Sequence, residues 1–316
     1  MRYLVTGGAG FIGSHTVDEL VRRSHGVVVL DDLSTGKAEN LAQARSKIKL
    51  IQESITNLDA LREACRGADC VIHLAAQTSV PRSVKDPIET NLINVNGTLN
   101  VLVAAREAKV KRVVFACSCA VYGKTSALPI RENAGLAPIS PYGVSKQVGE
   151  AYGRVFQEMY GLEFVSLRYF NVFGPRQDPS SPYSGVLSVF SAALLGGTQP
   201  TVYGDGEQSR DFVYVENVVA ANLLAAEAKG APGLAINVGT GSRCTLNQTL
   251  ALLEQITSRP AQAKYTSARE GDIRDSQADI GLAQQALGYH PRIGFEEGLK
   301  RTWEWFCAAQ NKPRRH

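Results

Sequence analysis

The sequence predicts an α/β protein built on a doubly wound parallel sheet, with a smaller α/β lobe attached to it. Three observations support this fold class. A short apolar stretch at the N-terminus runs directly into a glycine-rich turn. Strand-sized apolar segments then alternate with helix-like segments as far as Arg168, which is typical of a parallel sheet covered by helices on both faces. After Asn171 a proline-containing loop replaces the alternation and marks the start of the second lobe.

The first element is a strand at residues 3–5, followed by Gly7, Gly10 and Gly13 where a strand should turn into a helix. Gly7 permits the tight turn, Gly10 lets the backbone approach a pyrophosphate, and Gly13 lets the helix pack closely on the sheet. The free N–H groups and the positive end of that helix then face the anion. Glycine-rich turns also occur in ordinary loops, so the motif gains weight only from the strands and helices around it.

An acidic pair, Asp31 and Asp32, ends the second expected strand at residues 27–30. A carboxylate at this place accepts hydrogen bonds from both hydroxyls of an adenosine ribose and repels a 2′-phosphate. Asp31 is therefore the expected ribose acceptor, and NAD rather than NADP is the expected cofactor. The alternative is a solvated aspartate at a strand end.

Strands and helices continue in alternation up to the second lobe. Further strands are expected at residues 49–52, 70–74, 112–117 and 164–168, and helices at 58–65, 89–108 and 142–160. In a doubly wound sheet the ligand lies beyond the carboxyl ends of the strands. Residues 75–77, 118–122 and 169–171 are therefore expected to converge on one cleft.

The second lobe is expected to begin with a helix at residues 186–195 and a strand at 201–203. A segment at 211–215 that leads into a helix through residue 226, and a strand at 235–238, are expected to rejoin the large sheet. Helices at 245–256 and 294–306 complete the lobe. The expected division is an NAD-binding domain of residues 1–171 with a return segment at about 211–240, and a substrate-binding lobe of about 172–210 and 241–316.

Composition excludes several classes of protein. The chain has 316 residues, of which 44% are hydrophobic, enough for a large core. Its 34 basic and 30 acidic residues nearly balance, so we expect no nucleic-acid partner. Apolar runs are only as long as strands, so we expect no membrane span. The first strand leaves no room for a signal peptide, so we expect none. The six cysteines lack disulfide-rich or metal-ligating spacing, which predicts reduced cytoplasmic thiols and no metal site.

A tyrosine and a lysine lie one helical turn apart in the helix expected at residues 142–160. Tyr142 and Lys146 would lie one above the other on one helix face. A free tyrosine has a pKa of about 10, and a cation held close to it favours the phenolate. Lys146 and the positive nicotinamide of NAD⁺ would therefore prepare Tyr142 to take a proton from a sugar hydroxyl. Ser118, just past a strand, is placed to bond the same substrate oxygen.

In their order and spacing these residues resemble the extended short-chain dehydrogenase/reductases. The shared motifs are residues 6–13, 73–76, 94–98 and 118–123 and the pair of Tyr142 with Lys146, and the similarity covers nearly the whole chain. Within that family the chain is most similar to nucleotide-sugar 4-epimerases, because residues 168–177, 204–212 and 269–276 stand where those enzymes bind UDP. The resemblance implies a Rossmann-like domain, an NAD cofactor and a UDP-sugar substrate.

The resemblance also assigns site residues, with Ser118, Tyr142 and Lys146 as the catalytic ones. The residues expected to hold NAD are Gly7, Gly10, Phe11, Ile12, Gly13, Asp31, Asp32, Ser34, Thr35, Gly36, Ser54, Ile55, Leu74, Ala75, Ala76, Gln77, Asn94, Tyr142, Lys146 and Tyr169. The residues expected to contact the substrate are Ser79, Arg82, Ser118, Tyr142, Asn171, Val186, Tyr203, Arg210, Arg269, Asp272 and Ser276. Asn171 and the paired arginines Arg210 and Arg269 would hold the diphosphate. Asp272 would bind the uridine ribose, with Val186 and Tyr203 beside the uracil.

The two positions after Ser118 narrow the reaction that the resemblance implies. Related 4,6-dehydratases carry an acidic pair there, and related UDP-glucuronate decarboxylases carry a glutamate at the second position, whereas this chain has Cys119 and Ala120. Without an added acid, the expected reaction is oxidation of the sugar at C4 and its reduction on the other face, which is epimerisation. A UDP-glucuronate 4-epimerase and an NAD(P)H-dependent nucleotide-sugar reductase remain as alternatives, while intact catalytic residues argue against a non-catalytic NAD sensor.

Ser276 bears on the choice of sugar. In similar epimerases this position lies beside the 2-substituent of the sugar, where a small residue leaves room for an acetamido group. We therefore expect UDP-GlcNAc and UDP-GalNAc as substrates, alongside UDP-Glc and UDP-Gal. The alternative is a loop serine without this role, because one residue rarely fixes the size of a pocket.

Helices near residues 91–108 and 142–160 carry more apolar residues than one buried face requires. In the family such helices pair into a four-helix interface, so we expect a homodimer. One departure from the family concerns the cofactor: Ser54 stands where many members have an aspartate for the adenine amine.

Overall fold

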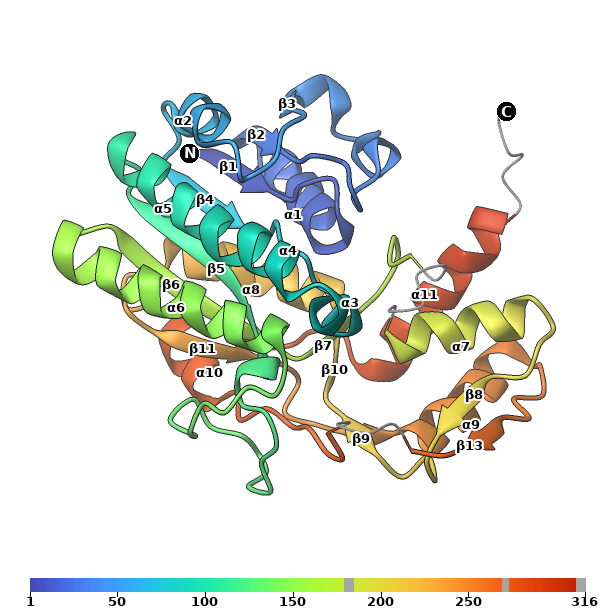
Figure 1. Ribbon diagram of the computed structural model, residues 1–316. Coiled ribbons are helices and arrows are strands. Elements are labelled where there is room, and N and C mark those ends of the chain that lie inside the picture. The colour runs from blue at the N-terminus through green and yellow to red at the C-terminus, as the bar shows by residue number, and fades with distance from the viewer. Residues whose placement is uncertain (179–184, 269–272, 311–316) are drawn as a thin grey trace.

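The computed structural model describes residues 1–178, 185–268 and 273–310 (Figure 1). Its main body is a seven-stranded sheet with the strand order β11-β6-β5-β4-β1-β2-β3, in which every neighbouring pair is parallel. The strands are β1 (Arg2–Thr6), β2 (Gly26–Leu30), β3 (Ile48–Ile51), β4 (Cys70–His73), β5 (Arg112–Ser118), β6 (Glu163–Tyr169) and β11 (Ala235–Val238). The chain winds outward from β1 in both directions, which confirms the doubly wound fold and opens a crevice beyond β1 and β4.

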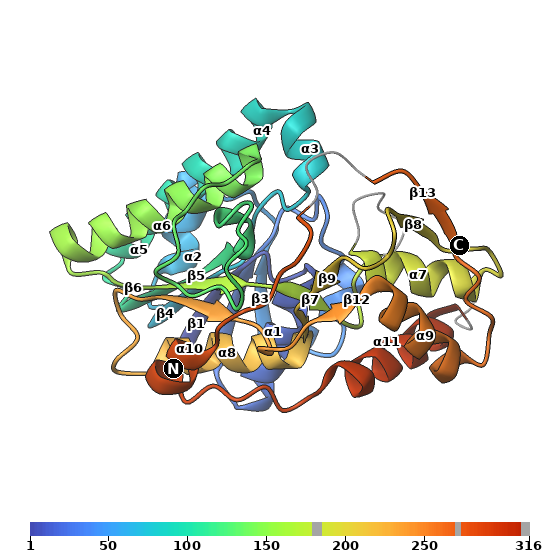
Figure 2. The same cartoon turned by 90° about the horizontal axis from the view of Figure 1, so that it is seen from below.

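Helices cover both faces of this sheet (Figure 2). One layer holds α2 (Leu58–Cys65), α3 (Val80–Lys85), α4 (Pro87–Asn91), α5 (Gly97–Glu107) and α6 (Pro141–Tyr160), and the other holds α1 (Phe11–Arg22), α8 (Val215–Glu227) and α10 (Gly281–Leu287). Single 3₁₀ turns lie at Ala38–Leu41, Arg45–Lys47 and Cys119–Val121. Strand residues alternate between the two apolar clusters, so that Leu4 faces the first layer and Val5 the second.

The second lobe has its own apolar cluster, which includes the fully buried Phe190 and Leu253. Its helices are α7 (Val186–Leu195), α9 (Leu246–Thr257) and α11 (Phe295–Gln310). Its strands pair as β7 (Asn171–Phe173) with β10 (Phe212–Tyr214), β8 (Thr201–Tyr203) with β13 (Lys264–Thr266), and β9 (Ser209–Arg210) with β12 (Cys244–Thr245). No helix within the described ranges is long and apolar enough to cross a membrane.

The expected return of residues 211–215 to the large sheet is wrong. β10 pairs with β7 in a separate two-stranded sheet, and β11 is the segment that returns, beside β6. The aromatic rings of β10 explain the difference, because Phe212 and Tyr214 pack against Phe173 on β7 with ring centroids 6.3 and 5.6 Å apart. These rings belong to the apolar cluster of the second lobe, so β10 stays with that lobe.

The helix expected at residues 89–108 is interrupted by a π-helical turn at Leu92–Asn96, which joins α4 to α5. Within this turn Asn94 is directed inward and is only 2% exposed. Single π turns of this kind are frequent at functional sites. The short helix α3 before it was not predicted; Ser79 caps it by accepting a hydrogen bond from the Arg82 N–H (3.1 Å).

α6 begins and ends at the residues that carry helix signals. Ser140 caps the first turn by accepting a hydrogen bond from the Gly143 N–H, and Gly161 ends the helix with a φ of 69°. Gly149 and Gly153 let the helix lie directly on the sheet, since a Cβ on either would come within 2.6 or 2.1 Å of a phenylalanine ring on β5 or β6. This close approach fixes the start of α6 over the carboxyl edge of the sheet.

His73, the last residue of β4, is 1% exposed and joins β1 to α5. Its Nδ1 lies 2.7 Å from the Thr6 hydroxyl and its Nε2 lies 3.0 Å from the Thr98 hydroxyl. Thr98 donates its own proton to the Asn94 carbonyl oxygen, so Nε2 carries the proton and Nδ1 accepts from Thr6. Burial lowers the pKa of His73 from its ordinary 6.5 to about 3, and the nearby charge of Lys146 acts in the same direction.

Because of this shift, His73 makes stability depend on pH. Below about pH 6.5 the unfolded chain binds a proton that the folded chain does not bind until near pH 3, so the free energy of unfolding falls as the pH falls between these values. We expect the His73 contribution at pH 5 to be about 2 kcal/mol smaller than at pH 7.5. Denaturant unfolding at both pH values measures it.

The His73→Gln variant keeps a donor and an acceptor but does not titrate, so its loss of stability between the two pH values should be smaller by about that amount. His290, which is exposed, provides the control substitution for removal of a histidine elsewhere. Equal pH dependence in His73→Gln and in the unaltered protein would contradict the assignment.

Candidate active site

The glycine turn after β1 has the shape of an anion cradle. Gly7 has a φ of 69°, and a Cβ there would lie 2.7 Å from the Ala75 nitrogen, so the turn touches the segment after β4. A Cβ on Gly13 would lie 2.0 Å from the Gly7 carbonyl oxygen, whereas one on Gly10 would meet a single atom, at 3.2 Å. No side chain caps the start of α1, where Phe11 and Ile12 lie. The N-terminal N–H groups are therefore available to a pyrophosphate, and the turn fits a dinucleotide.

Asp31 lies beside this turn and is 6% exposed. Its carboxylate accepts hydrogen bonds from the Ala9 N–H (2.8 Å) and the Leu33 N–H (2.9 Å). Burial raises its pKa above the ordinary value, and these N–H groups oppose the rise. Gly36 lies directly against Asp31, because a Cβ at Gly36 would come within 2.9 Å of the Asp31 carboxylate.

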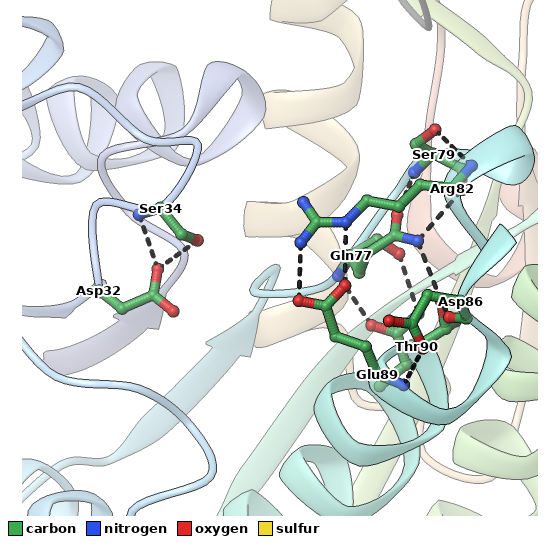
Figure 3. Close-up of polar contacts among 9 residues, drawn as sticks. Asp32, Ser34, Gln77, Ser79, Arg82, Asp86, Glu89 and Thr90 are labelled. Carbon is green, nitrogen blue, oxygen red and sulfur yellow. Dashed lines mark hydrogen bonds and ion pairs between the residues drawn. The ribbon is translucent and has the colours of Figure 1, made fainter.

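The other residues predicted for the adenosine end lie on neighbouring loops at the same edge of the sheet. Asp32 accepts hydrogen bonds from the N–H (2.9 Å) and hydroxyl (2.6 Å) of Ser34, which shapes the loop after β2, where Thr35 also lies (Figure 3). Ser54 and Ile55 follow β3, and the Ser54 hydroxyl accepts a hydrogen bond from Thr56. Their contact with adenine stays a prediction.

Asn94 connects the segment after β4 to the helix that carries the catalytic pair. Its Oδ1 accepts from the Gln77 N–H (2.7 Å), and its Nδ2 donates to the Gln77 carbonyl (2.9 Å) and to the Ser145 hydroxyl (3.0 Å). These hydrogen bonds thus fix the position of residues 74–77 relative to α6. The Asn94 amide is thus engaged with protein groups, and its contact with the cofactor stays a prediction.

Arg82, one of the predicted substrate residues, forms an ion pair with a neighbouring carboxylate. Its guanidinium pairs with Glu89 at 2.7 Å, and its side chain is 44% exposed; Figure 3 shows the two groups facing each other. The Ser79 hydroxyl caps the N-terminus of α3. The neighbouring Ser83 is fully buried and accepts a hydrogen bond from the Tyr142 N–H (3.1 Å). Ser83 therefore ties α3 to the start of α6.

Ser118, Tyr142 and Lys146 meet at the carboxyl end of β5, as predicted. Ser118 is the last residue of that strand, and its side chain lies near enough to the Tyr142 phenol to act on the pKa of that group. The Lys146 Nζ lies 5.9 Å from the centre of the Tyr142 ring and donates to the Ala116 carbonyl oxygen at 2.8 Å. Two chain segments, the end of β5 and the start of α6, thus bring a hydroxyl, a phenol and an ammonium together.

Burial favours the neutral forms of both ionisable groups in this trio. It raises the pKa of Tyr142 above its ordinary value, and the nearby Ser118 side chain opposes the rise. It lowers the pKa of Lys146 from 10.5 to about 8. We expected Lys146 to lower the pKa of Tyr142, but in this structure Ser118 is the group that lowers it. The effect of the nicotinamide on this pKa stays a prediction.

A cavity of about 240 Å³ in the second lobe collects four of the residues predicted for the substrate. Asn171, Val186, Tyr203 and Arg210 all line it. Sequence reasoning missed Gln177, which also lines it and whose only signal in the sequence is its place at the end of the motif at residues 168–177. Arg210 donates to the Ser209 and Arg274 carbonyl oxygens at 2.9 and 3.0 Å, which holds its guanidinium at the β9 edge.

The remaining predicted residues lie apart from this cavity or outside the described ranges. Ser276 is 6% exposed, and its hydroxyl is buried without a hydrogen-bond partner among the described residues. Tyr169 donates its hydroxyl proton to Asn222 on α8 at 2.5 Å, so its phenol is directed away from the trio's layer. Arg269 and Asp272 lie outside the described residues.

Comparison with known proteins agrees with this geometry. A model of the NAD dependent epimerase/dehydratase family matches residues 3–239. A putative UDP-glucose 4-epimerase of Methanocaldococcus jannaschii is 40% identical over 304 residues, covering 96% of this chain and 97% of that protein. The structure of Thermotoga maritima UDP-glucose 4-epimerase with UDP-glucose has a TM-score of 0.94 at 40% identity and covers 98% of this chain and 100% of that one.

A further solved structure broadens the range of sugars among relatives. UDP-N-acetylglucosamine 4-epimerase of Methanobrevibacter ruminantium, in complex with UDP-N-acetylmuramic acid, has a TM-score of 0.93 at 41% identity and covers 98% of both chains. Other relatives include a UDP-glucuronate 4-epimerase and a UDP-N-acetyl-α-D-glucosaminuronate decarboxylase, and several solved relatives are complexes with NAD. The chain therefore belongs to the NAD-dependent epimerase/dehydratase family, with NAD as its cofactor, and the relatives that resemble it over its whole length are mainly UDP-sugar 4-epimerases.

Proposed function

We propose that this chain is a 4-epimerase of UDP-hexoses that interconverts UDP-GlcNAc with UDP-GalNAc and UDP-Glc with UDP-Gal. The observation that carries the proposal is the trio of Ser118, Tyr142 and Lys146 at the carboxyl end of β5, the edge of the sheet where the dinucleotide cradle also lies. Cys119 and Ala120 follow Ser118, so these positions offer no acid for dehydration or decarboxylation.

In the proposed reaction each member of the trio has one task. Tyr142 takes the proton of the C4 hydroxyl as the sugar is oxidised and returns it when the sugar is reduced. Ser118 bonds the same oxygen and steadies the proton between the two hydroxyls. Lys146, held by the Ala116 carbonyl, supplies positive charge next to the phenol and binds the nicotinamide ribose. NAD would supply the acceptor, and then the donor, of the C4 hydride within one turnover, so it should stay with the protein.

The second lobe would hold the nucleotide while the sugar turns. Asn171 and Arg210 line the cavity and suit the diphosphate, with Arg269 as the second arginine of the expected pair. Val186 and Tyr203 would lie beside the uracil. Asp272 would bind the uridine ribose.

The choice of sugar rests on Ser276. Its buried hydroxyl has no partner among the described residues, and a small side chain there leaves room for an acetamido group. A UDP-glucuronate 4-epimerase is the alternative within the same chemistry, since relatives include one. An NAD(P)H-dependent reductase is the alternative outside it, and would release its oxidised cofactor.

We also propose that the protein acts as a homodimer in the cytoplasm. Its six cysteines are free thiols, as expected in a reducing compartment. A row of exposed apolar side chains follows the outer side of α3 and α4, with Val84 at 64% and Ile88 at 81% exposure. A second row follows α6 at Val144, Val155 and Met159. A second copy would cover both rows in a four-helix interface.

The first experiment incubates the purified protein, without added cofactor, with UDP-GlcNAc, UDP-Glc and UDP-glucuronate separately. We expect UDP-GalNAc and UDP-Gal to form, and Tyr142→Phe to lower kcat by about 10²- to 10⁴-fold while NAD stays bound, since general acid–base catalysis contributes that much. Chromatography of the products measures it. A product from UDP-glucuronate alone would favour that alternative, and a requirement for stoichiometric NAD(P)H would favour the reductase.

The role of Ser276 is tested by its size. We expect Ser276→Tyr to lower the ratio of UDP-GlcNAc to UDP-Glc turnover by about tenfold or more, because the ring would occupy the space of the acetamido group. Ser276→Ala removes the hydroxyl without adding volume and is the matched control. An unchanged ratio in a Ser276→Tyr variant that retains NAD would show that the position has no gating role.

The dimer is tested by charge. The unaltered protein should sediment at twice the chain mass of 34.1 kDa at micromolar concentration. Ile88→Glu should shift it toward one chain mass, because it buries an unpaired carboxylate in the interface. Val189→Glu on α7, also at an exposed apolar position, is the control and should remain dimeric. A single-chain mass for the unaltered protein would refute the dimer.

A further inference from the structure

A short loop of the second lobe, residues 174–178, is fastened to the cofactor-binding domain at three points; we call it the strap. The Arg176 guanidinium donates to the Asp18 carboxylate at 2.6 Å, and the Lys37 ammonium donates to Asp178 at 2.7 Å. Between them, the His15 ring hydrogen-bonds the Pro175 carbonyl oxygen at 2.9 Å. Residues far apart in the sequence are therefore joined across the two lobes.

On the domain side, the strap is held by elements that form the dinucleotide site. Asp18 and His15 belong to α1, the helix whose first turn faces the pyrophosphate cradle. Lys37 follows Gly36, and its N–H donates to the Ala9 carbonyl oxygen of the glycine turn at 3.0 Å. Any shift of these elements on cofactor binding is thus passed to the strap.

On the lobe side, the strap forms part of the wall of the cavity. Gln177 lines the cavity and accepts a hydrogen bond from the Ser188 hydroxyl on α7 at 2.7 Å. Gly185 lies against it, since a Cβ there would be 3.2 Å from the Gln177 amide nitrogen. Moving the strap therefore moves one wall of the cavity and the start of α7.

The ion pair of Arg176 with Asp18 is sheltered, with side-chain exposures of 16% and 22%. The second guanidinium nitrogen of Arg176 and the second oxygen of Asp18 are buried and have no hydrogen-bond partner among the described residues. Arg176 also has a φ of 68°, a conformation that is costly for a residue other than glycine. The backbone of the strap at Arg176 is therefore not set by local preference, and the contact with Asp18 is one of the interactions that hold it.

We propose that Arg176 and Asp18 are positioning residues that couple the nucleotide-sugar site to the NAD site, so that bound UDP slows the loss of NAD and bound NAD tightens the binding of UDP. The inference rests on the proposed function, because it takes the cavity of the second lobe to be the site of UDP. Coupling of this kind is reciprocal, so either ligand measures it. A purely structural contact between lobes would change stability without changing this coupling.

The test uses the purified NAD-bound protein and UDP itself. Calorimetry gives the Kd of UDP, and repeated ultrafiltration with and without saturating UDP gives the rate of NAD loss. We expect Arg176→Ala and Asp18→Ala to weaken UDP binding about tenfold, within the usual range for coupled sites, and to abolish the protection of NAD by UDP. The turnover number should stay within about twofold, because the strap does not touch the trio.

Three further variants separate positioning from folding. Arg176→Lys, and the charge exchange Arg176→Asp with Asp18→Arg, keep opposite charges across the contact and should restore much of the protection. Arg176→Gly removes the backbone strain together with the ion pair, so protection should still be lost in a stable protein. Arg22→Ala, on the same helix and paired with Glu19 at the surface, is the control and should behave like the unaltered protein.

The outcomes for this inference and for the proposed function are distinct. An unaltered protein that does not bind UDP would overturn the proposed function. An unaltered protein that binds UDP, together with Arg176→Gly and Asp18→Ala variants in which UDP still protects NAD, would overturn the coupling alone.

Discussion

The buried hydrogen bonds between the ends of β1, β4 and α6 are the constraint on which the site depends. His73 donates to Thr98, Thr98 donates to the Asn94 carbonyl, and Asn94 holds both the backbone of Gln77 and the Ser145 hydroxyl. Every donor in this network has an acceptor only if the imidazole is neutral and protonated on one nitrogen. A satisfied network of this kind specifies one arrangement, whereas apolar packing alone tolerates several. The glycine turn, the segment after β4 and the catalytic helix are therefore placed relative to each other before any ligand binds.

The same burial that fixes α6 creates an electrostatic problem at its start. Glycines bring the helix onto the sheet, and Arg168 on β6 pairs with Glu150 one turn after Lys146, with side chains only 5% and 15% exposed. Because the helix packs so closely on the sheet, Tyr142 and Lys146 both lose solvation, and each favours its neutral form. One weakened ammonium does not offset the desolvation of a phenolate. A further positive charge beside Tyr142 would favour the proposed proton transfer, and the nicotinamide of NAD⁺ would supply one there.

The sequence predicted those features that local signals encode. The strands of the large sheet, the glycine turn with Asp31, and the meeting of Ser118 with Tyr142 and Lys146 followed from apolar periodicity and from the rule that ligands bind at the carboxyl edge. Contacts between distant segments could not be predicted in this way. β10 has the apolar composition of a sheet strand, and only its packing against Phe173 places it in the second lobe. The ion pair of Arg82 with Glu89 on the neighbouring helix is another such contact, and the role of Arg82 at the substrate stays a prediction.

The proposed reaction places opposite demands on the two ends of the substrate. The sugar must present both faces of C4 to the same trio, so the sugar must rotate. The nucleotide must stay fixed, so that C4 again lies beside the trio after the rotation. Separate cores meet these demands, because the cavity belongs to a lobe whose apolar cluster is distinct from those of the sheet. A separate lobe would, however, allow the nucleotide to drift relative to the cofactor. The sheltered contact of Arg176 with Asp18, in the positioning role proposed for it, would limit that drift where the cavity wall meets the cofactor helix. Freedom at the sugar is thus compatible with a fixed distance between nucleotide and cofactor.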